Sequence, residues 1–363
     1  MKSELQNSFS SAELEALVLR SDTPSLELAR LLSGKISTAV IDVGARAAGV
    51  EFDWWRLDGL AKFYGFEPDA VECARLSREA KETNRPADYF PVGLGREAKM
   101  SPLYITQHPA CSSIYEPDPV LIARYQGLQV TTPVRETQIQ LARLDDWWSG
   151  EGNPEVSFVK IDTQGSELDI LEGAPNLLAQ CLGVEVEIEF ARIYQNQPLF
   201  HQVDALMQSS GFHLWRVYGL THYCETEPND YTNVDRQFFG GSLSTSFDSG
   251  PGRLFWGNAI YLRDYRSDYF RLNPTRLPTL MALLEGMGET DGVCAASQLL
   301  VKFGLTPEFT DRALARLRAR RLKVSSSPDA DGSRDRLKSA LTKADQWDRF
   351  RGSLLGRAIG RFY

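Results

Sequence analysis

Short apolar runs recur along the chain and alternate with segments in which apolar residues lie three and four positions apart. Apolar runs that end in polar residues or glycine predict buried parallel strands, and the longer period predicts helices. The strands are predicted at residues 37–45, 62–68, 88–95, 156–162, 182–190, 212–220 and 253–264, and helices at residues 70–84, 165–173 and 198–211. Alternating strands and helices predict an α/β fold: a mostly parallel sheet of seven strands, covered by helices.

The last two predicted strands depart from this alternation. Only a polar loop, residues 221–250, lies between them, so we expect an antiparallel pair at one edge of the sheet. Residues 1–36 predict an N-terminal helical segment, residues 37–267 the α/β domain, and residues 268–363 a helical C-terminal extension.

Composition and charge exclude several classes of protein. The chain has 363 residues, 42% of them hydrophobic, and a net charge of −8, which argues against a nucleic-acid-binding protein. Its five cysteines are scattered without a Cys-x-x-Cys pair, which predicts neither a disulfide framework nor a zinc site and fits a reducing compartment. There is no apolar run long enough to span a membrane and no pattern of a secretion signal, so a cytoplasmic location is predicted.

The first predicted strand ends in the sequence VIDVGARAAG, residues 40–49. In doubly wound sheets, ligands bind beyond the carboxyl ends of strands, beside the first strand–helix turn. Gly44 would let the backbone approach a ligand closely, and Glu67, at the end of the second strand, could accept the two hydroxyls of a ribose. The alternatives are a tight turn without a ligand and a solvated carboxylate.

The composition of this turn indicates which nucleoside it would bind. A dinucleotide site needs Gly-x-Gly-x-x-Gly, whereas the segment from Gly44 to Gly49 lacks the middle glycine. Asp42 would repel a phosphate but suits the cationic sulfonium and ammonium groups of S-adenosylmethionine. A nicotinamide-dependent reductase is disfavoured by the same missing glycine and by the lack of a Tyr-x-x-x-Lys pair near the fourth strand.

Several segments, in order, resemble the FkbM family of S-adenosylmethionine-dependent methyltransferases. These segments are VIDVGA, FEPD, SSIYEP at residues 112–117, ARLDDW at 142–147, VKIDTQGSELDILEGA at 159–174 and VEIEFARIYQNQPLF at 186–200. The resemblance covers roughly residues 37–262. It implies the class I methyltransferase fold, S-adenosylmethionine as cofactor, and cofactor-binding residues Asp42, Gly44, Ala45, Gly49, Glu67 and Pro68. Many members of the family have Asn and Gly where this chain has Arg46 and Ala48.

Methyl transfer to a hydroxyl needs alignment of acceptor, methyl and sulfur, together with a base for the departing proton. Asp162 ends the fourth strand beside the cofactor turn, and Glu187 lies on the neighbouring fifth strand. We hypothesise that both line the acceptor pocket and that one of them is the base. Lys160 shares a strand face with Asp162 and would keep its carboxylate ionised or bind an acidic sugar. An alternative role of the two acids is to bind Mg²⁺, although no dedicated acidic motif supports it, so no metal site is predicted.

The predicted protein is therefore an O-methyltransferase that acts on a hydroxyl of a small molecule or glycan, such as a sugar of a surface glycan or secondary metabolite. The rival hypothesis is a non-catalytic glycan- or partner-binding module that has kept the fold. Residues 310–363 carry 14 Lys/Arg and 6 Asp/Glu, and the terminal segment from Trp347 to Phe362 predicts a basic amphipathic helix. Such a helix could bind an anionic membrane surface or a partner protein. The oligomeric state is not indicated.

Overall fold

The computed structural model describes residues 38–46, 61–225 and 252–286, together with positions 292, 293, 295, 296 and 299. The predicted N-terminal helical segment, Ala48, Gly49 and the basic tail lie outside these described residues. All described residues belong to the first of the two units into which the chain divides, which ends at Thr310.

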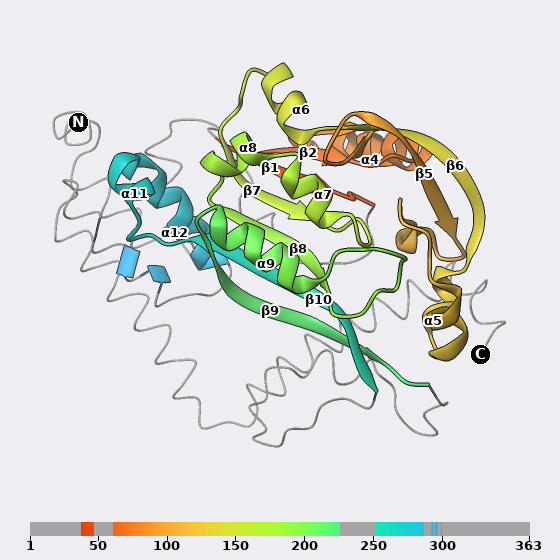
Figure 1. The fold of residues 1–363 in the computed structure, drawn as a ribbon. Helices are drawn as coiled ribbons and strands as arrows, with labels where there is room; N and C mark the ends of the chain where they lie inside the picture. Colours follow the sequence, from red (N-terminus) through yellow and green to blue (C-terminus); the bar gives the residue numbers. More distant parts are fainter. Residues whose placement is uncertain are drawn as a thin grey trace, which may run out of the picture. The chain divides into compact units, whose positions relative to one another are not determined.

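Seven strands form one sheet, in the order β3-β2-β1-β7-β8-β10-β9 (Figure 1). The parallel strands are β1 (Thr38–Val43), β2 (Ala61–Phe66), β3 (Ala87–Phe90), β7 (Val156–Ile161) and β8 (Gly183–Glu189). At one edge, β10 (Arg253–Arg263) runs antiparallel to both β8 and β9 (Phe212–Tyr223). The prediction of a mostly parallel seven-stranded sheet with an antiparallel pair at its edge is confirmed.

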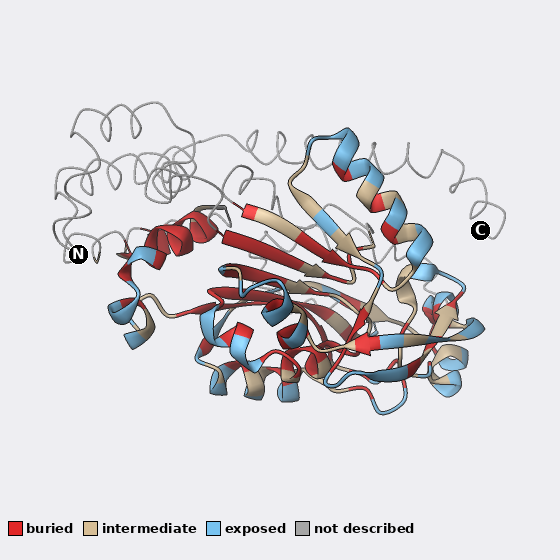
Figure 2. Cartoon of the chain, turned by 90° about the horizontal axis from the view of Figure 1, so that it is seen from above, coloured by how far each residue is buried: buried red, intermediate tan, exposed pale blue. Residues whose placement is uncertain are grey.

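Helices follow the second, fourth and fifth predicted strands as the apolar periodicity predicts, and further short helices occur that were not predicted. The helices are α4 (Ala70–Glu82), α5 (Pro119–Arg124), α6 (Leu144–Gly150), α7 (Glu167–Glu172), α8 (Pro175–Gln180), α9 (Phe200–Ser209), α11 (Asp268–Leu272) and α12 (Leu277–Gly286), with short 3-10 turns η2 (Pro109–Cys111), η3 (Leu128–Thr131) and η4 (Pro274–Arg276). The strands at the centre of the sheet are buried along their length, whereas α4 is buried on one side only (Figure 2).

The main core lies between one face of the sheet and helices α6 to α9. Alternate residues of the central strands, such as Ile41, Val159 and Val186, point into it and are almost fully buried. Trp147 of α6 packs edge-on against Phe66 and Phe90, with ring centroids 5.0 and 5.4 Å apart. These contacts fix the ends of β2 and β3, beside the glycine turn.

The structure corrects one prediction in this region. Residues 88–95 do not form one strand: β3 ends at Phe90, and Gly93–Leu94 form β4 of a second sheet. That sheet, in the order β4-β6-β5, pairs β6 (Pro133–Ala142) with β5 (Lys99–Thr106) and was not predicted. Most residues of β6 are exposed or only half-buried, so hydrogen bonds between strands define it more than an apolar face does.

The helical segment after the sheet is attached to the beginning of β7. Arg276 donates a hydrogen bond to the carbonyl oxygen of Val156 (3.1 Å) and lies 3.3 Å from the Ser157 hydroxyl. Its Nε is 3.3 Å from a carboxylate oxygen of Glu155. The α12 side chains that follow, including Leu280 and Leu284, are buried. The amino-terminal end of β7 is therefore covered by residues from far along the chain.

Candidate active site

The turn after β1 is built for a close approach of backbone to backbone. Gly44 has a φ of +77°, and a β carbon there would lie 1.8 Å from the carbonyl oxygen of Asp162. The amides of Gly44 and Ala45 both donate to the carbonyl oxygen of Phe66, at 3.0 and 3.1 Å. The turn thus joins the carboxyl ends of β1, β2 and β7, and only glycine fits at its centre.

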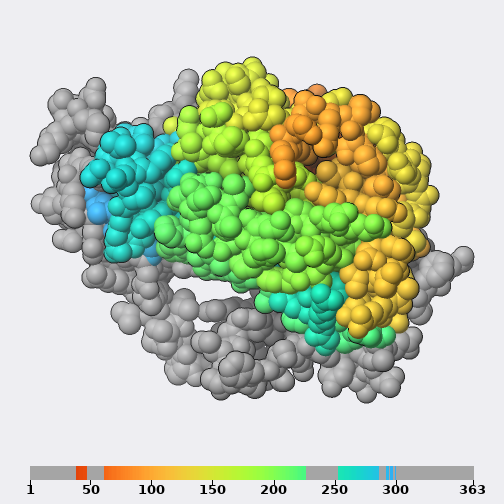
Figure 3. Space-filling model, viewed as in Figure 1, coloured from red at the N-terminus to blue at the C-terminus, as the bar shows by residue number. Residues whose placement is uncertain are grey.

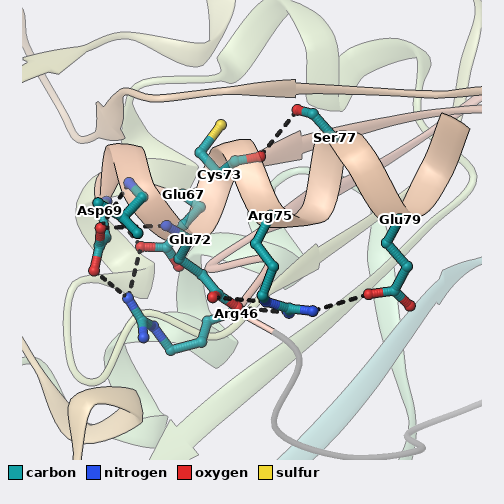
Figure 4. A network of polar contacts seen from close by, with 9 residues as sticks. Arg46, Glu67, Asp69, Glu72, Cys73, Arg75, Ser77 and Glu79 are labelled. Carbon is teal, nitrogen blue, oxygen red and sulfur yellow. Dashed lines mark hydrogen bonds and ion pairs between the residues drawn. The ribbon is translucent and has the colours of Figure 1, made fainter. Parts of the chain in front are cut away.

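Acidic side chains follow β2 at the same edge of the sheet. Glu67 is buried, and its Oε1 accepts a hydrogen bond from the amide of Asp69 (2.9 Å). Arg46, which follows the glycine turn, places Nη2 3.5 Å from Oε1 of Glu67 and 2.8 Å from Oδ2 of Asp69 (Figure 4). Burial raises the pKa of Glu67, and the Asp69 amide and Arg46 partly offset this. Pro68 is half-buried between the two acids.

Lys160 links the strand of the glycine turn to the strand of the predicted base. In the sheet, it lies opposite Asp42 on β1 and opposite Glu185 on β8. Its Nζ is 3.4 Å from Oδ1 of Asp42 and 3.8 Å from Oδ2 of Asp162. Of the two roles considered for Lys160, this geometry supports the stabilisation of carboxylates rather than the binding of an acidic sugar.

Asp162 and Glu187 are brought together by a residue to which the sequence assigned no role. Nε2 of Gln164 lies 3.1 Å from Oδ1 of Asp162 and 2.7 Å from Oε2 of Glu187. Burial, together with the negative charges of Asp162, Glu189 and Glu167, raises the pKa of Glu187 well above its usual range. The position of Gln164 beside a glycine in a strand–helix turn is the sequence signal that could have identified it.

The buried carboxylate of Glu167 binds the backbone of this strand–helix turn. Its carboxylate accepts hydrogen bonds from the amides of Thr163 (2.8 Å) and Gly165 (2.9 Å) and from the Thr163 hydroxyl. Burial raises its pKa to about 7, against the effect of these backbone amides. Glu167 therefore holds the turn in shape and faces inward rather than towards solvent.

Two further segments, around Ser113 and around Tyr194, contact this turn. Ser113 donates a hydrogen bond to the carbonyl oxygen of Gln164 (2.7 Å), and Tyr194 contacts Gln164 Oε1 (3.2 Å) and the carbonyl oxygen of Cys111 (2.7 Å). A β-bridge pairs Pro117 with Tyr194. The space-filling view shows the segment that precedes α9 adjoining α5 on this side of the domain (Figure 3).

The position of Tyr194 and Gln197, in a predicted loop after the fifth strand, suggests contacts to a sugar ring. In the structure, both are fully buried, and the Gln197 carboxamide accepts a hydrogen bond from the Tyr194 amide. Ser113, in the segment SSIYEP, could contact substrate or cap a helix by its residue type, but its hydroxyl binds the backbone of Gln164.

Asp145 is structural, as its place in a predicted turn before two tryptophans indicates. It accepts hydrogen bonds from the backbone amides of Asn176 (3.0 Å) and Leu177 (2.9 Å) at the start of α8.

Among the described residues, no group of three or more His, Cys, Asp or Glu side chains is arranged to hold a metal ion. The part of the chain that the structure describes also contains no helix long and apolar enough to cross a bilayer.

The fold and the glycine turn define the class of the protein. Numbered within the large sheet, the strands run 3-2-1-4-5-7-6 with the seventh antiparallel, which is the arrangement of class I S-adenosylmethionine-dependent methyltransferases. Residues 42–214 match the model of the methyltransferase FkbM domain, the family that the motifs of the sequence predicted. The protein is accordingly a methyltransferase with S-adenosylmethionine as cofactor.

One curated relative is the 2-O-methyltransferase NoeI of Sinorhizobium fredii (strain NBRC 101917 / NGR234). It is 24% identical over 205 residues, which cover 52% of this chain and 80% of NoeI. Similar solved structures include magnesium protoporphyrin IX methyltransferase (ChlM) from Synechocystis PCC 6803 with bound SAM (10% identity, TM-score 0.30, 72% of this chain and 97% of that chain). Another is geranyl diphosphate methyltransferase in complex with SAM (11% identity, TM-score 0.31, 72% and 94%). At such TM-scores, these alignments carry no argument, and the fold class rests on the strand order.

Proposed function

We propose that the protein is an O-methyltransferase that methylates a hydroxyl group of a sugar, with Asp162 or Glu187 as general base. The observation that carries this proposal is the position of Asp162, whose backbone oxygen touches the turn at Gly44 while its side chain meets Glu187 through Gln164. A relative that is a 2-O-methyltransferase supports transfer to oxygen. That the acceptor hydroxyl belongs to a sugar is part of the proposal only.

The residues around the glycine turn fit S-adenosylmethionine. We assign its binding to Asp42, Gly44, Ala45, Glu67 and Pro68, because they lie at the carboxyl ends of β1 and β2, where ligands bind in such sheets, and Glu67 can accept the ribose hydroxyls. The glycine at position 44 is required by the backbone of Asp162, which fills the place of its β carbon. The sixth predicted binding residue, Gly49, lies outside the described residues. When bound, the cofactor supplies an electrophilic methyl group on a sulfonium.

The side chains of the site would then act on the acceptor hydroxyl. Asp162 or Glu187 accepts its proton as the oxygen attacks, and alignment of the acceptor with the methyl group supplies much of the acceleration. Lys160 places its positive charge between Asp42 and Asp162, 3.4 and 3.8 Å from their carboxylate oxygens. None of these steps uses a metal ion.

The first experiment is calorimetry with S-adenosylhomocysteine on the full chain. Binding supports an active methyltransferase, whereas no binding would favour the rival hypothesis of a non-catalytic module. The second is transfer of a radiolabelled methyl group from S-adenosylmethionine to a set of methyl pyranosides, with and without a chelator. Full turnover by both Asp162→Asn and Glu187→Gln would exclude the base assignment, and loss of activity with the chelator would favour a Mg²⁺ role.

We further propose a cytoplasmic location, with membrane contact by the C-terminal tail as a hypothesis for residues outside the described part. Flotation with anionic liposomes tests the contact. Equal flotation of the full protein and of a protein without residues 340–363 would exclude it.

A further inference from the structure

Gln164 has a backbone conformation that its residue type rarely adopts. Its φ is +60°, and the next residue, Gly165, has a φ of +106°, so two successive residues are left-handed. A non-glycine residue in this region is uncommon and persists where its surroundings hold it. Here Ser113 donates to the carbonyl oxygen of Gln164, and Glu167 accepts the amide of Gly165. A strained residue held from both sides, next to the predicted base, points to a role in function.

This conformation directs the carboxamide of Gln164 between two carboxyl groups. A carboxamide nitrogen carries two hydrogens, so it can give one to Oε2 of Glu187 and one to Oδ1 of Asp162. The Tyr194 hydroxyl lies 3.2 Å from Oε1 of Gln164 and 2.7 Å from the carbonyl oxygen of Cys111. Glutamine has the length to reach both acids from this turn, whereas asparagine is one methylene shorter.

The two carboxyl groups differ in their surroundings. Glu187 is buried, and the charges that act on it most strongly come from the carboxylates Asp162, Glu189 and Glu167, with Cys111 of η2 and Tyr194 also facing this region. The side chain of Asp162 is 24% exposed and lies 3.8 Å from Nζ of Lys160. Burial, together with the neighbouring negative charges, raises the pKa of Glu187 well above its usual range, so Glu187 is the group that holds a proton.

We propose that Gln164 is a positioning residue for methyl transfer: it binds Oε2 of Glu187 and Oδ1 of Asp162, which leaves Oδ2 of Asp162 to accept the proton of the acceptor hydroxyl. This inference rests on the proposed function and selects Asp162 as the base. With S-adenosylmethionine bound, a lone pair of the acceptor oxygen would form the bond to the methyl carbon, and the electron pair of the breaking carbon–sulfur bond would stay on sulfur. The hydroxyl proton moves to Asp162 and is then released to water.

Infrared pH titration of the protonated carboxyl band tests this without any acceptor. The band that disappears in Glu187→Gln belongs to Glu187. In Gln164→Leu and Gln164→Gly, the carboxylate of Glu187 loses an N–H donor, so we expect the midpoint of this band to rise by roughly one to two pH units. An unchanged midpoint in both variants would overturn the proposal.

Asn196→Gly is the matched control. Asn196 has a φ of +61° and is exposed, so this change relieves the same backbone strain without touching the two acids. We expect the titration midpoint to stay at its wild-type value. A shift equal to that of Gln164→Gly would mean that backbone relief alone causes the effect, which also overturns the proposal.

Calorimetry separates this inference from the proposed function. We expect Gln164→Leu and Gln164→Gly to bind S-adenosylhomocysteine within about twofold of wild type, because the amide faces the acceptor side, and to lose on the order of 100-fold in kcat on a methyl pyranoside acceptor. Failure of the wild type to bind S-adenosylhomocysteine would refute the proposed function, while the infrared result would still decide the arrangement of protons. Wild-type kcat in Gln164→Gly would overturn the positioning role.

Discussion

The backbone oxygen of Asp162 occupies the place where a β carbon on Gly44 would have to lie, only 1.8 Å away. The end of β1, the strand predicted to bind the cofactor, and the end of β7, the strand that carries the predicted base, are therefore packed against each other at the backbone. A change on one strand must displace the other.

Gly44→Ala should therefore damage both stability and cofactor binding. We expect the free energy of unfolding to fall by roughly 2–4 kcal/mol, from the left-handed φ together with the clash, and S-adenosylhomocysteine binding to be lost. Urea unfolding and calorimetry measure the two effects. Gly152→Ala is the control, since Gly152 has a φ of +79° but nothing within 4 Å of the added carbon. It should cost roughly 1–2 kcal/mol and leave binding intact. Equal losses in the two variants would contradict the steric argument.

Glu67→Gln tests the ribose assignment. Loss of a charged acceptor of two hydroxyls should weaken S-adenosylhomocysteine binding about 10- to 100-fold, as measured by calorimetry. Glu79→Gln is the control, because Glu79 ends the same polar network in Figure 4 through Arg75 but is exposed on α4. The Glu79→Gln variant should bind S-adenosylhomocysteine with wild-type affinity. Wild-type affinity in Glu67→Gln would show that Glu67 does not contribute to cofactor binding.

Asp145→Ala tests whether Asp145, in the segment ARLDDW, has a structural role. Removal of a buried carboxylate that accepts two backbone amides of α8 should lower the free energy of unfolding by roughly 1–3 kcal/mol, without changing the affinity for S-adenosylhomocysteine. Its neighbour Asp146, with a side chain 59% exposed, should tolerate alanine within about 0.5 kcal/mol. A loss of affinity in Asp145→Ala at full stability would indicate a direct role instead.

The raised pKa of Glu167 predicts that the stability of the protein depends on pH. Its pKa in the folded protein, about 7, lies above the ordinary value of 4.5, so the folded state holds this proton more tightly than the unfolded state. The stability that this proton contributes is full below about pH 4.5 and is lost as pH rises through 7, a change of roughly 3 kcal/mol.

Urea unfolding at several pH values between 4.5 and 8 measures this slope. The difference between wild type and Glu167→Gln isolates the contribution of Glu167 from that of other titrating groups. The variant should show a flatter decline over this range. Parallel curves for the two proteins would show that Glu167 does not titrate there.

The sequence predicted what depends on burial and on strand ends. The apolar runs that contain Ile41, Val159 and Val186 identified central strands because a parallel strand is buried on both faces. The β5–β6 pair escaped prediction because most positions of β6 are at least partly exposed and Pro102 interrupts the β5 pattern. The burial of β6 alternates only from Thr137 to Leu141, which is a short signal for a sequence reading to detect.

The site was predicted only in part, for a similar reason. Asp162, Lys160 and Glu187 follow from strand ends and strand faces, and the structure brings them together. The role of Gln164 depends on a left-handed backbone and on contacts to Ser113 and Tyr194, which are 51 and 30 residues away. No local pattern of residues carries that information. Tyr194 likewise looked like a loop residue, because the pairing that buries it involves a segment that precedes β6.

The hydrogen bonds of Arg276 bear on how this domain should be expressed in isolation. A recombinant protein that stops at residue 267, where the helical extension was predicted to begin, would lose the guanidinium that binds Val156 and the apolar side chains of α12. The first residues of β7 would then be exposed at the opposite end of the very strand that leads to Asp162. Val293 and Ala296 are also fully buried, so trimming for crystallisation or NMR should begin beyond Ala296, even though the motifs of methyl transfer end well before it.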